Sequence, residues 1–337
     1  MANRRVFVYD PLDVPEDWLR TWELELTHAT PLHASGRARP KMTAEDLVLG
    51  ARGHQALLGG SGARITKEVL DALPELRFVA KLGIGWEVID VAAATARGVV
   101  VTNSPAHSEV ELVAEHTIGL MLACLKQFTW YNTAYVRDGG WRDGGHLLGS
   151  LTGSSIGIIG YGNIGRAVAR RLQGWGVELL VHDVRPVVPE AGETVELEPL
   201  LRRADLVTLH TPAMRDEPPL LDRKRLELLK PGAVVINTAR GSLIDRAALA
   251  ELLTSGRIAA AAVDVFEPEP PTAEDPLLSA PNVFATPHVA AWNPRVRLEM
   301  VEMALSGLRD LFDGKVPPHV VNHEVLRERD LIRQGES

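Results

Sequence analysis

The sequence predicts an α/β fold built from two open, parallel β-sheets. Two series of short apolar runs, within residues 1–103 and 155–288, alternate with stretches of helical pattern. Strands that alternate with helices along a chain form parallel βαβ units. With 337 residues, of which 45% are hydrophobic, the chain is long enough to bury the cores of two domains.

Five strands and two helices are expected in the first series. The helices are KEVLDAL (67–73) and DVAAATARG (90–98), and the strands are RVFVYD (5–10), ELTHAT (25–30), QALLGG (55–60), RFVAKLG (77–83) and VVVTN (99–103). A long helix over 108–128 follows, with Ser108 and Glu111 at the spacing of an N-terminal capping box. Because this helix is apolar on most faces, we expect it to be a buried connection between the series.

Six strands are expected in the second series. They are SIGIIG (155–160), ELLVHD (178–183), LVTLH (206–210), AVVINTA (233–239), IAAAAVDV (258–265) and VFATPH (283–288). Six strands with intervening helices match a complete doubly wound nucleotide-binding sheet. Residues 129–150, rich in Gly, Trp and Tyr, have no clear period, so we expect a loop or an arm that packs on a partner subunit. A helical pattern returns at 295–312.

The charge and composition exclude several classes of partner. The net charge is −8 and the pI is about 5.8, whereas binding to nucleic acid or an anionic membrane requires concentrated basic charge. We therefore expect no nucleic-acid partner and no membrane partner. No apolar stretch is long enough to span a bilayer, and the four apolar residues before Asp10 are too few for a signal peptide. The single cysteine, Cys124, indicates a reducing compartment, so we expect a cytoplasmic protein.

The histidines indicate no metal site. They show neither HxH nor HExxH spacing, and no pair of cysteines accompanies them. His116, in the apolar helix, is expected to be a hydrogen-bonded core residue.

A glycine-rich turn stands between an apolar strand and a helix in SSIGIIGYGNIGRAVARRL. Gly160, Gly162 and Gly165 have the GxGxxG spacing. Such glycines allow a tight turn, close approach of a pyrophosphate and close packing of helix on strand, while the helix N-terminus offers free N–H groups to the anion. The next strand ends in Asp183, where a carboxylate would accept the ribose hydroxyls of an adenosine. Because Asp183 would repel a 2′-phosphate, NAD is expected over NADP, although Arg185 weakens this preference.

Three strand ends of the second series carry an ionisable residue: Arg240 in NTARGSLID, Glu269 in DVFEPEP and His288 in TPHVAAW. The carboxyl ends of the strands open onto the ligand crevice of a doubly wound sheet, so we expect the three to converge on the cofactor. Together they suit hydride transfer to a ketone. The cation binds a substrate carboxylate and polarises the carbonyl, the imidazolium donates a proton, and the carboxylate stabilises that imidazolium.

The chain resembles the D-isomer-specific 2-hydroxyacid dehydrogenase family, an NAD-dependent family of oxidoreductases. Four motifs of that family stand here in order, as GYGNIG, NTARG, DVFEPEP and TPH, and the match extends to about Asn322. The family's arginine, glutamate and histidine fall on Arg240, Glu269 and His288, which leaves Glu267 as a solvated neighbour. The resemblance places at the cofactor Gly160, Gly162, Asn163, Ile164, Gly165, Asp183, His210, Thr211, Pro212, Thr238, Ala239, Arg240, Asp264 and His288, with Asp264 facing the nicotinamide amide.

The resemblance also implies the arrangement of domains. A Rossmann NAD-binding domain of about 104–293 would be inserted into a discontinuous, flavodoxin-like substrate domain of about 1–103 and 294–337. Both would be doubly wound parallel-sheet domains. The family further implies a homodimer in which residues 129–150 contact the partner subunit.

Substrate contacts are expected in part from the first domain. The loop LGIGWEVID resembles the family's glycine loop, whose backbone amides hold the substrate carboxylate. In phosphoglycerate-type members an arginine precedes the serine of the segment LLGGSGAR, whereas here Gly60 precedes Ser61, which disfavours 3-phosphoglycerate. Small 2-keto acids such as glyoxylate, hydroxypyruvate or pyruvate, and bulkier ones, stay open as substrates. The substrate-binding residues implied are Ser61, Ile84, Gly85, Asn103, Arg240 and His288.

Other functions are open beside this one. The C-terminal binding protein corepressors resemble the same family and keep its fold and its three catalytic residues, so an NAD(H)-sensing interaction protein is one alternative. A 3-phosphoglycerate dehydrogenase is another. Phosphite and formate dehydrogenases use related scaffolds, but formate enzymes typically replace the catalytic glutamate with glutamine, so Glu269 argues against that reaction.

Overall fold

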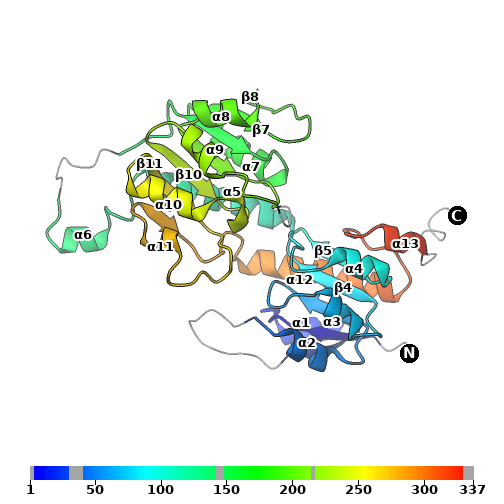
Figure 1. The fold of residues 1–337 in the computed structure, drawn as a ribbon. Coiled ribbons are helices and arrows are strands. Elements are labelled where there is room, and N and C mark those ends of the chain that lie inside the picture. Colours follow the sequence, from blue (N-terminus) through cyan, green and yellow to red (C-terminus); the bar gives the residue numbers. More distant parts are fainter. Residues whose placement is uncertain (1–3, 30–40, 142–147, 214–216, 329–337) are drawn as a thin grey trace. The chain divides into compact units, whose positions relative to one another are not determined.

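The computed structural model describes residues 4–29, 41–141, 148–213 and 217–328 (Figure 1). The chain divides into two compact units, one of residues 1–109 and 293–337 and one of residues 110–292. Each unit contains one parallel β-sheet with helices on both faces, which confirms the predicted α/β class. Residues 142–147 of the predicted arm and the C-terminal residues 329–337 lie outside the described residues.

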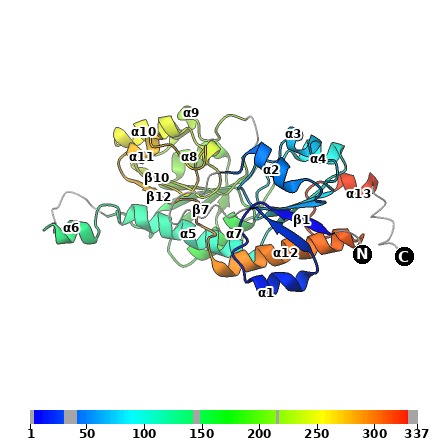
Figure 2. The same ribbon diagram turned by 90° about the horizontal axis from the view of Figure 1, so that it is seen from below.

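The first unit contains a five-stranded parallel sheet in the order β2-β1-β3-β4-β5, the order of flavodoxin-like folds. All five predicted strands are confirmed. Helices α2, α3 and α4 cover one face of the sheet and α12 covers the other (Figure 2). The strands are β1 (Arg5–Val8), β2 (Glu25–His28), β3 (Ala56–Gly59), β4 (Phe78–Leu82) and β5 (Val100–Ser104), and the helices are α1 (Glu16–Leu19), η1 (Arg20–Trp22), α2 (Ala44–Ala51), α3 (Lys67–Asp71), α4 (Val91–Ala96), α12 (Pro294–Phe312) and α13 (Glu324–Glu328).

The second unit contains a seven-stranded parallel sheet in the order β12-β11-β10-β9-β6-β7-β8. Helices α5 and α7 lie on one face, and α8, α9 and α10 lie on the other (Figure 2). The strands are β6 (Ser155–Ile159), β7 (Glu178–His182), β8 (Glu193–Thr194), β9 (Leu206–Leu209), β10 (Ala233–Asn237), β11 (Ile258–Val263) and β12 (Val283–Ala285), and the helices are α5 (His107–Leu125), α6 (Thr133–Arg137), α7 (Asn163–Leu172), α8 (Leu197–Arg203), α9 (Arg223–Leu228), η2 (Gly241–Leu243), α10 (Arg246–Thr254) and α11 (Pro276–Ser279).

The strand order of the second sheet reverses beside β6. From β6 the chain first adds β7 and β8 on one side and then crosses to β9, β10, β11 and β12 on the other. Such a switch point opens a crevice outside the carboxyl ends of the strands, where doubly wound sheets bind ligands. All six predicted strands are confirmed, and the order places the ends of β10, β11 and β12 next to one another.

Helix α5 confirms the long helix predicted between the two series, but its start differs from the prediction. Ser108 does not cap the helix, because the helix already begins at His107. The first turn instead binds Glu299 of α12, which accepts the His107 backbone N–H (2.7 Å) and the Ser108 hydroxyl. Cys124 lies buried near the other end of α5, where burial raises the pKa of its thiol to about 12. It is therefore a packed residue and not a reactive thiol.

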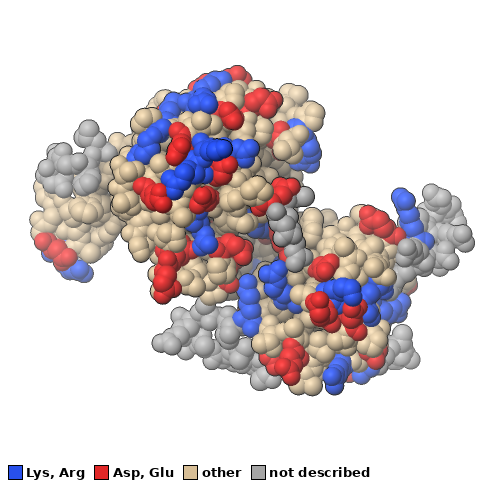
Figure 3. Space-filling model, viewed as in Figure 1, with Lys and Arg blue, Asp and Glu red and all other residues tan. Residues whose placement is uncertain are grey.

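Basic and acidic side chains are mixed on the face of the molecule shown in Figure 3. The molecule also contains surface ion pairs, such as Arg203 with Glu178 (2.8 Å) and with Glu193 (2.7 Å). Among the described residues on the face that Figure 3 shows, no continuous basic surface of the kind that binds a phosphate backbone is seen. Within the described ranges, no helix is both long enough and apolar enough to cross a membrane.

Candidate active site

The three glycines of the turn after β6 differ in their surroundings. Gly160 has a φ of +94°, and a Cβ there would lie 2.4 Å from the carbonyl oxygen of His210. A Cβ on Gly165 would lie 2.1 Å from the carbonyl oxygen of Gly160, so the first turn of α7 packs directly on the end of β6. A Cβ on Gly162 would meet nothing within 4 Å. The space over Gly162 is therefore open, while its two partners are fixed by packing.

Helix α7 begins at this turn without a side-chain cap. Its N-cap is Gly162, and in the described part of the chain no side-chain cap bonds the first N–H groups. These free N–H groups, the positive end of the helix dipole and the open space over Gly162 form the site that a pyrophosphate needs. The residues present thus fit a dinucleotide such as NAD.

Asp183 directly follows β7, and its side chain is only 7% exposed. One carboxylate oxygen accepts the backbone N–H of Tyr161, inside the glycine turn, at 2.8 Å. The other accepts the backbone N–H of Arg185 at 2.9 Å and its Nε at 3.3 Å. Although burial opposes the charge, these hydrogen bonds hold the pKa of Asp183 below its ordinary value. An ionised carboxylate therefore joins the end of β7 to the glycine turn.

His210 follows β9 and packs beside the glycine turn. Its Nε2 lies 2.9 Å from the hydroxyl of Thr208, and burial lowers the pKa of His210 to about 3. The ring is therefore neutral at physiological pH. Its buried Nδ1 has no hydrogen-bond partner among the described residues, so a polar atom is left for a ligand at this strand end.

Arg240 is held by the turn that follows β10. The buried Asn237 side chain accepts the N–H of Ala239 (3.0 Å) and donates to the carbonyl oxygen of Arg240 (2.8 Å). At Gly241 a Cβ would lie 2.2 Å from the backbone of Phe266, so the turns after β10 and β11 touch through their main chains. Only glycine allows this approach. The sequence NTARG thus places Arg240 beside the loop that carries Glu269.

Glu269 and His288 form a hydrogen-bonded pair across the ends of β11 and β12. Nδ1 of His288 lies 2.9 Å from Oε2 of Glu269, and the other oxygen of Glu269 accepts the N–H of Phe266 at 3.0 Å. The bond to Glu269 raises the pKa of His288 above its ordinary value, against the opposing effects of burial and of the nearby Arg240 charge. The two side chains are 52% and 30% exposed, so a ligand can reach the imidazole. Glu267, by contrast, is exposed.

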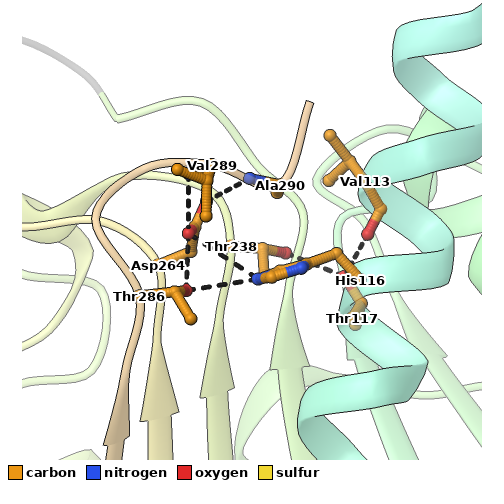
Figure 4. Close-up of polar contacts among 8 residues, drawn as sticks. All are labelled: Val113, His116, Thr117, Thr238, Asp264, Thr286, Val289 and Ala290. Atoms are coloured by element: carbon orange, nitrogen blue, oxygen red, sulfur yellow. Dashed lines mark hydrogen bonds and ion pairs between the residues drawn. The ribbon is translucent and has the colours of Figure 1, made fainter. Parts of the chain in front are cut away.

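Asp264 directly follows β11, and its side chain lies among Thr286, Val289 and Ala290 (Figure 4). It is fully buried. One carboxylate oxygen accepts the Thr286 hydroxyl (2.6 Å) and the N–H of Val289 (2.9 Å), and the other accepts the N–H of Ala290 (3.0 Å). The Asp264 carbonyl oxygen accepts the N–H of His288 at 2.7 Å. This carboxylate accepts hydrogen bonds from the loop, and its predicted place facing a nicotinamide amide stays a prediction.

The backbone of His288 is itself unusual. Its φ is +53°, in the left-handed region that residues other than glycine rarely adopt. Such a conformation costs about 1–3 kcal/mol and persists only where the surroundings hold it. The bonds from Asp264 on both sides of His288 supply that support. The sequence contained the aspartate but no sign that its partners would be backbone N–H groups of residues 289 and 290.

Four of the six residues predicted to bind substrate belong to the first unit. Ser61 follows β3, Ile84 and Gly85 follow β4, and Asn103 lies in β5, so these four stand near the carboxyl ends of neighbouring strands. The Asn103 amide donates to the carbonyl oxygen of Ile84 at 2.8 Å and so fixes the glycine loop.

Asp10 is a residue of this strand-end cluster that the sequence did not reveal. Its carboxylate accepts the N–H groups of Gly60 (2.7 Å) and Gly62 (3.0 Å), on either side of Ser61.

The remaining predicted cofactor residues lie at strand ends of the second unit. Asn163 and Ile164 open α7 after β6, Thr211 and Pro212 follow β9, and Thr238 and Ala239 follow β10. Within the described residues, no cluster of three or more His, Cys, Asp or Glu side chains is arranged to hold a metal ion.

Comparison with known proteins gives consistent results. The family model described as "D-isomer specific 2-hydroxyacid dehydrogenase, NAD binding domain" matches residues 118–290. The glyoxylate reductase of Korarchaeum cryptofilum is 38% identical over 273 residues, which are 79% of this chain and 82% of that protein. The D-3-phosphoglycerate dehydrogenase of Mycobacterium tuberculosis is 37% identical over 83% of this chain, but the match spans only 54% of that protein.

A solved structure agrees with the sequence matches. The NADPH-dependent glyoxylate/hydroxypyruvate reductase of Sinorhizobium meliloti, determined in complex with citrate, superimposes with a TM-score of 0.79 at 31% identity. The alignment covers 95% of this chain and 98% of the other. The two units therefore both have counterparts in one solved chain.

Proposed function

This chain belongs to the D-isomer specific 2-hydroxyacid dehydrogenase family, and from that premise we propose that it reduces a small 2-keto acid, such as glyoxylate or hydroxypyruvate, to the D-2-hydroxy acid. NAD is the cofactor, since residues 118–290 match the family's NAD-binding domain. The names of the similar reductases support the substrate class. The reverse reaction, oxidation of the hydroxy acid, uses the same residues.

The observation that carries the proposal is the His288–Glu269 pair. Glu269 engages Nδ1 of the ring at 2.9 Å, and Nε2 has no hydrogen-bond partner among the described residues. NADH, when bound, supplies the hydride. The Nε2–H of protonated His288 then donates the proton that the substrate oxygen gains as its carbon accepts the hydride. Glu269 stabilises the imidazolium before the transfer, which keeps the donor charged near neutral pH.

Arg240 supplies the positive charge of the site. It is near enough to His288 for its charge to oppose the protonation of the imidazole, and we propose that both groups bind one substrate molecule. A guanidinium binds a carboxylate through two parallel hydrogen bonds, and its charge also polarises the adjacent carbonyl. We propose that Arg240 holds the 2-keto acid by its carboxylate. The contacts from Ser61, Ile84, Gly85 and Asn103 stay predictions.

The turn at Ser61 favours an unphosphorylated substrate over 3-phosphoglycerate. The N–H groups of Gly60 and Gly62 already bind the Asp10 carboxylate, and a Cβ on Gly60 would lie 3.1 Å from the same group. The turn thus carries a negative charge and has Gly60, not an arginine, before Ser61, so a second anion such as a phosphate would be repelled there. Arg64, which is exposed three residues after Ser61, is a cation that could offset this repulsion.

The preference for NAD over NADP rests on Asp183. Its lowered pKa keeps it ionised, and a 2′-phosphate beside it would meet a like charge. Arg185, whose side chain is 73% exposed, is the one group beside Asp183 that the structure offers to such a phosphate within the described residues.

The quaternary structure and the location stay predictions. A homodimer through residues 129–150 is supported by large apolar side chains that are exposed on and beside this segment, namely Phe128, Trp130, Val136, Trp141 and Leu148. Exposed apolar groups in such a number mark a surface that another protein covers.

The experiment that tests the proposal is a panel of 2-keto acids assayed by the loss of NADH absorbance. Glyoxylate, hydroxypyruvate, pyruvate and phosphohydroxypyruvate are compared for the wild type, Arg240→Ala and His288→Ala. We expect turnover of at least one unphosphorylated acid, and a loss of about 100-fold or more in each variant. Full activity in both variants, with thermal unfolding unchanged, would exclude the proposed roles.

A further inference from the structure

We propose that His116 is a positioning residue for the catalytic histidine and acts through Thr286 and Asp264. This inference rests on the proposed function, because it concerns the loop that presents His288 to the substrate. His116 lies on α5, a helix that contributes no residue to the catalytic three. Its Nε2 lies 3.2 Å from the hydroxyl of Thr286 and 3.7 Å from the Asp264 carboxylate (Figure 4).

The direction of these bonds follows from the number of protons. The Thr286 hydroxyl has one proton and donates it to Asp264 at 2.6 Å. The same oxygen can therefore only accept from His116, so Nε2 of His116 carries a hydrogen and donates it. A chain of donors thus runs from the imidazole through Thr286 to the buried carboxylate. Bonds linked in this way strengthen one another in a poorly solvated site.

This chain ends on the loop that carries His288. Asp264 holds that loop by the N–H groups of Val289 and Ala290, and Thr286 stands two residues before His288 on its other side. The left-handed backbone of His288, with φ +53°, is stable only while both sides are held. His116 fixes the Thr286 side. Without His116, the Thr286 hydroxyl would still donate to Asp264 but would no longer accept a hydrogen bond itself. The imidazole of His288 would then be held less firmly in its orientation.

The next residue of α5 contacts the other catalytic loop. The hydroxyl of Thr117 donates to the Val113 carbonyl oxygen at 2.7 Å and lies 2.9 Å from the hydroxyl of Thr238, which must then be the donor (Figure 4). Thr238 stands two residues before Arg240, as Thr286 stands two residues before His288. The neighbouring residues His116 and Thr117 therefore contact the loop of His288 and the loop of Arg240, respectively. We infer that α5 fixes the positions of these two loops relative to each other.

The test compares two substitutions at His116. His116→Leu fills the space but removes the donor, whereas His116→Gln places an amide N–H near the position of Nε2. His54 offers a matched control, because its Nε2 likewise lies within hydrogen-bonding distance of a threonine hydroxyl, that of Thr27 (2.9 Å), and neither residue is among those predicted to form the site. His54→Leu and His54→Gln are assayed beside them. For each protein we would measure kcat and KM for the keto acid, the Kd of NADH by fluorescence, and the thermal midpoint.

We expect His116→Leu to lower kcat by about 10- to 100-fold, the size of loss that a misplaced catalytic group causes, with the Kd of NADH changed less than about twofold. His116→Gln is expected to recover most of kcat, and both His54 variants to keep the wild-type kcat. Thr286→Val should add little in the His116→Leu background, since both act on one chain of bonds. Equal losses in His116→Leu and His116→Gln, or a wild-type kcat in His116→Leu, would overturn the inference.

His288→Ala distinguishes a failure of the proposed function from a failure of the positioning role of His116. If it retains activity, the proposed function fails and this inference fails with it. If it abolishes activity while His116→Leu keeps the wild-type kcat, the positioning role alone is excluded.

Discussion

Nδ1 of His288 and Oε2 of Glu269 lie 2.9 Å apart, across the ends of two neighbouring strands. A neutral imidazole beside a carboxylate keeps its hydrogen on the nitrogen that faces the acid, so its other nitrogen presents a lone pair. The same ring is thus a proton donor when charged and a base when neutral. The pair therefore serves keto-acid reduction and hydroxy-acid oxidation with one geometry.

The first prediction concerns the pH at which reduction fails. Glu269 raises the pKa of His288, so Glu269→Gln removes the charge and lowers that pKa. Because the protonated ring is the donor, reduction is fully available below the pKa of His288 and is lost as the pH rises through it. The variant should lose activity at a lower pH than the wild type, with kcat/KM reduced by about 10- to 100-fold at alkaline pH and by less in acid. Profiles of kcat/KM against pH measure the displacement.

Glu267→Gln is the matched control for this prediction. Glu267 is two residues away in the same loop but is exposed, and the bond to the imidazole comes from Glu269. The pH above which Glu267→Gln loses keto-acid reduction should be the same as for the wild type. Equal displacement in the two variants would mean that the charge of the loop, and not the hydrogen bond, sets the pKa of His288.

The second prediction separates folding from binding within the glycine turn. A methyl group at Gly165 would lie 2.1 Å from a backbone oxygen, whereas one at Gly162 would meet no atom within 4 Å. Gly165→Ala should therefore lower the free energy of unfolding by about 1–3 kcal/mol, the typical cost of overpacking. Gly162→Ala should keep the thermal midpoint but weaken NADH binding by roughly tenfold, because its methyl group would occupy the approach of the pyrophosphate.

Thermal melts without cofactor and fluorescence titrations with NADH measure the two effects independently. A wild-type Kd in Gly162→Ala would show that the cofactor does not approach this glycine. A wild-type midpoint in Gly165→Ala would show that the helix can move away from β6.

The strands of both sheets could be predicted because each central strand is a run of apolar residues long enough to stand out. β10, for example, is buried at every position from Ala233 to Asn237. β8 could not be predicted in this way, since Glu193 and Thr194 are polar, exposed and only two in number. It forms because the packed sheet brings this part of the chain alongside the edge of β7. This tertiary contact has no signal in the local sequence.

The site was predictable to the extent that it depends on residue types at strand ends. Parallel strands end at one edge, so Arg240, Glu269 and His288 had to come near one another once the strand order was set. The inward turn of Asp264 was not predictable, because its partners are backbone N–H groups, which every residue but proline carries. The contact of His116 with Thr286 was hidden for a similar reason, since the two residues lie 170 positions apart.

The third prediction concerns the choice of cofactor. The ionised Asp183 at the end of β7 would repel a 2′-phosphate, whereas the exposed guanidinium of Arg185 would attract it. Asp183→Ser removes the repulsion and leaves Arg185 free of its present partner. The ratio of kcat/KM for NADPH to that for NADH should rise by about tenfold or more, the effect of removing one close like charge.

In Asp183→Ser with Arg185→Ser, most of that gain should disappear, because the remaining site holds no cation for the phosphate. Thermal melts must accompany the assays, since Asp183 also binds the N–H of Tyr161 and its loss can loosen the glycine turn. Loosening alone would raise the KM of both cofactors together and leave their ratio unchanged. A wild-type enzyme that uses NADPH as well as NADH would contradict the assignment of Asp183, whatever the variants do.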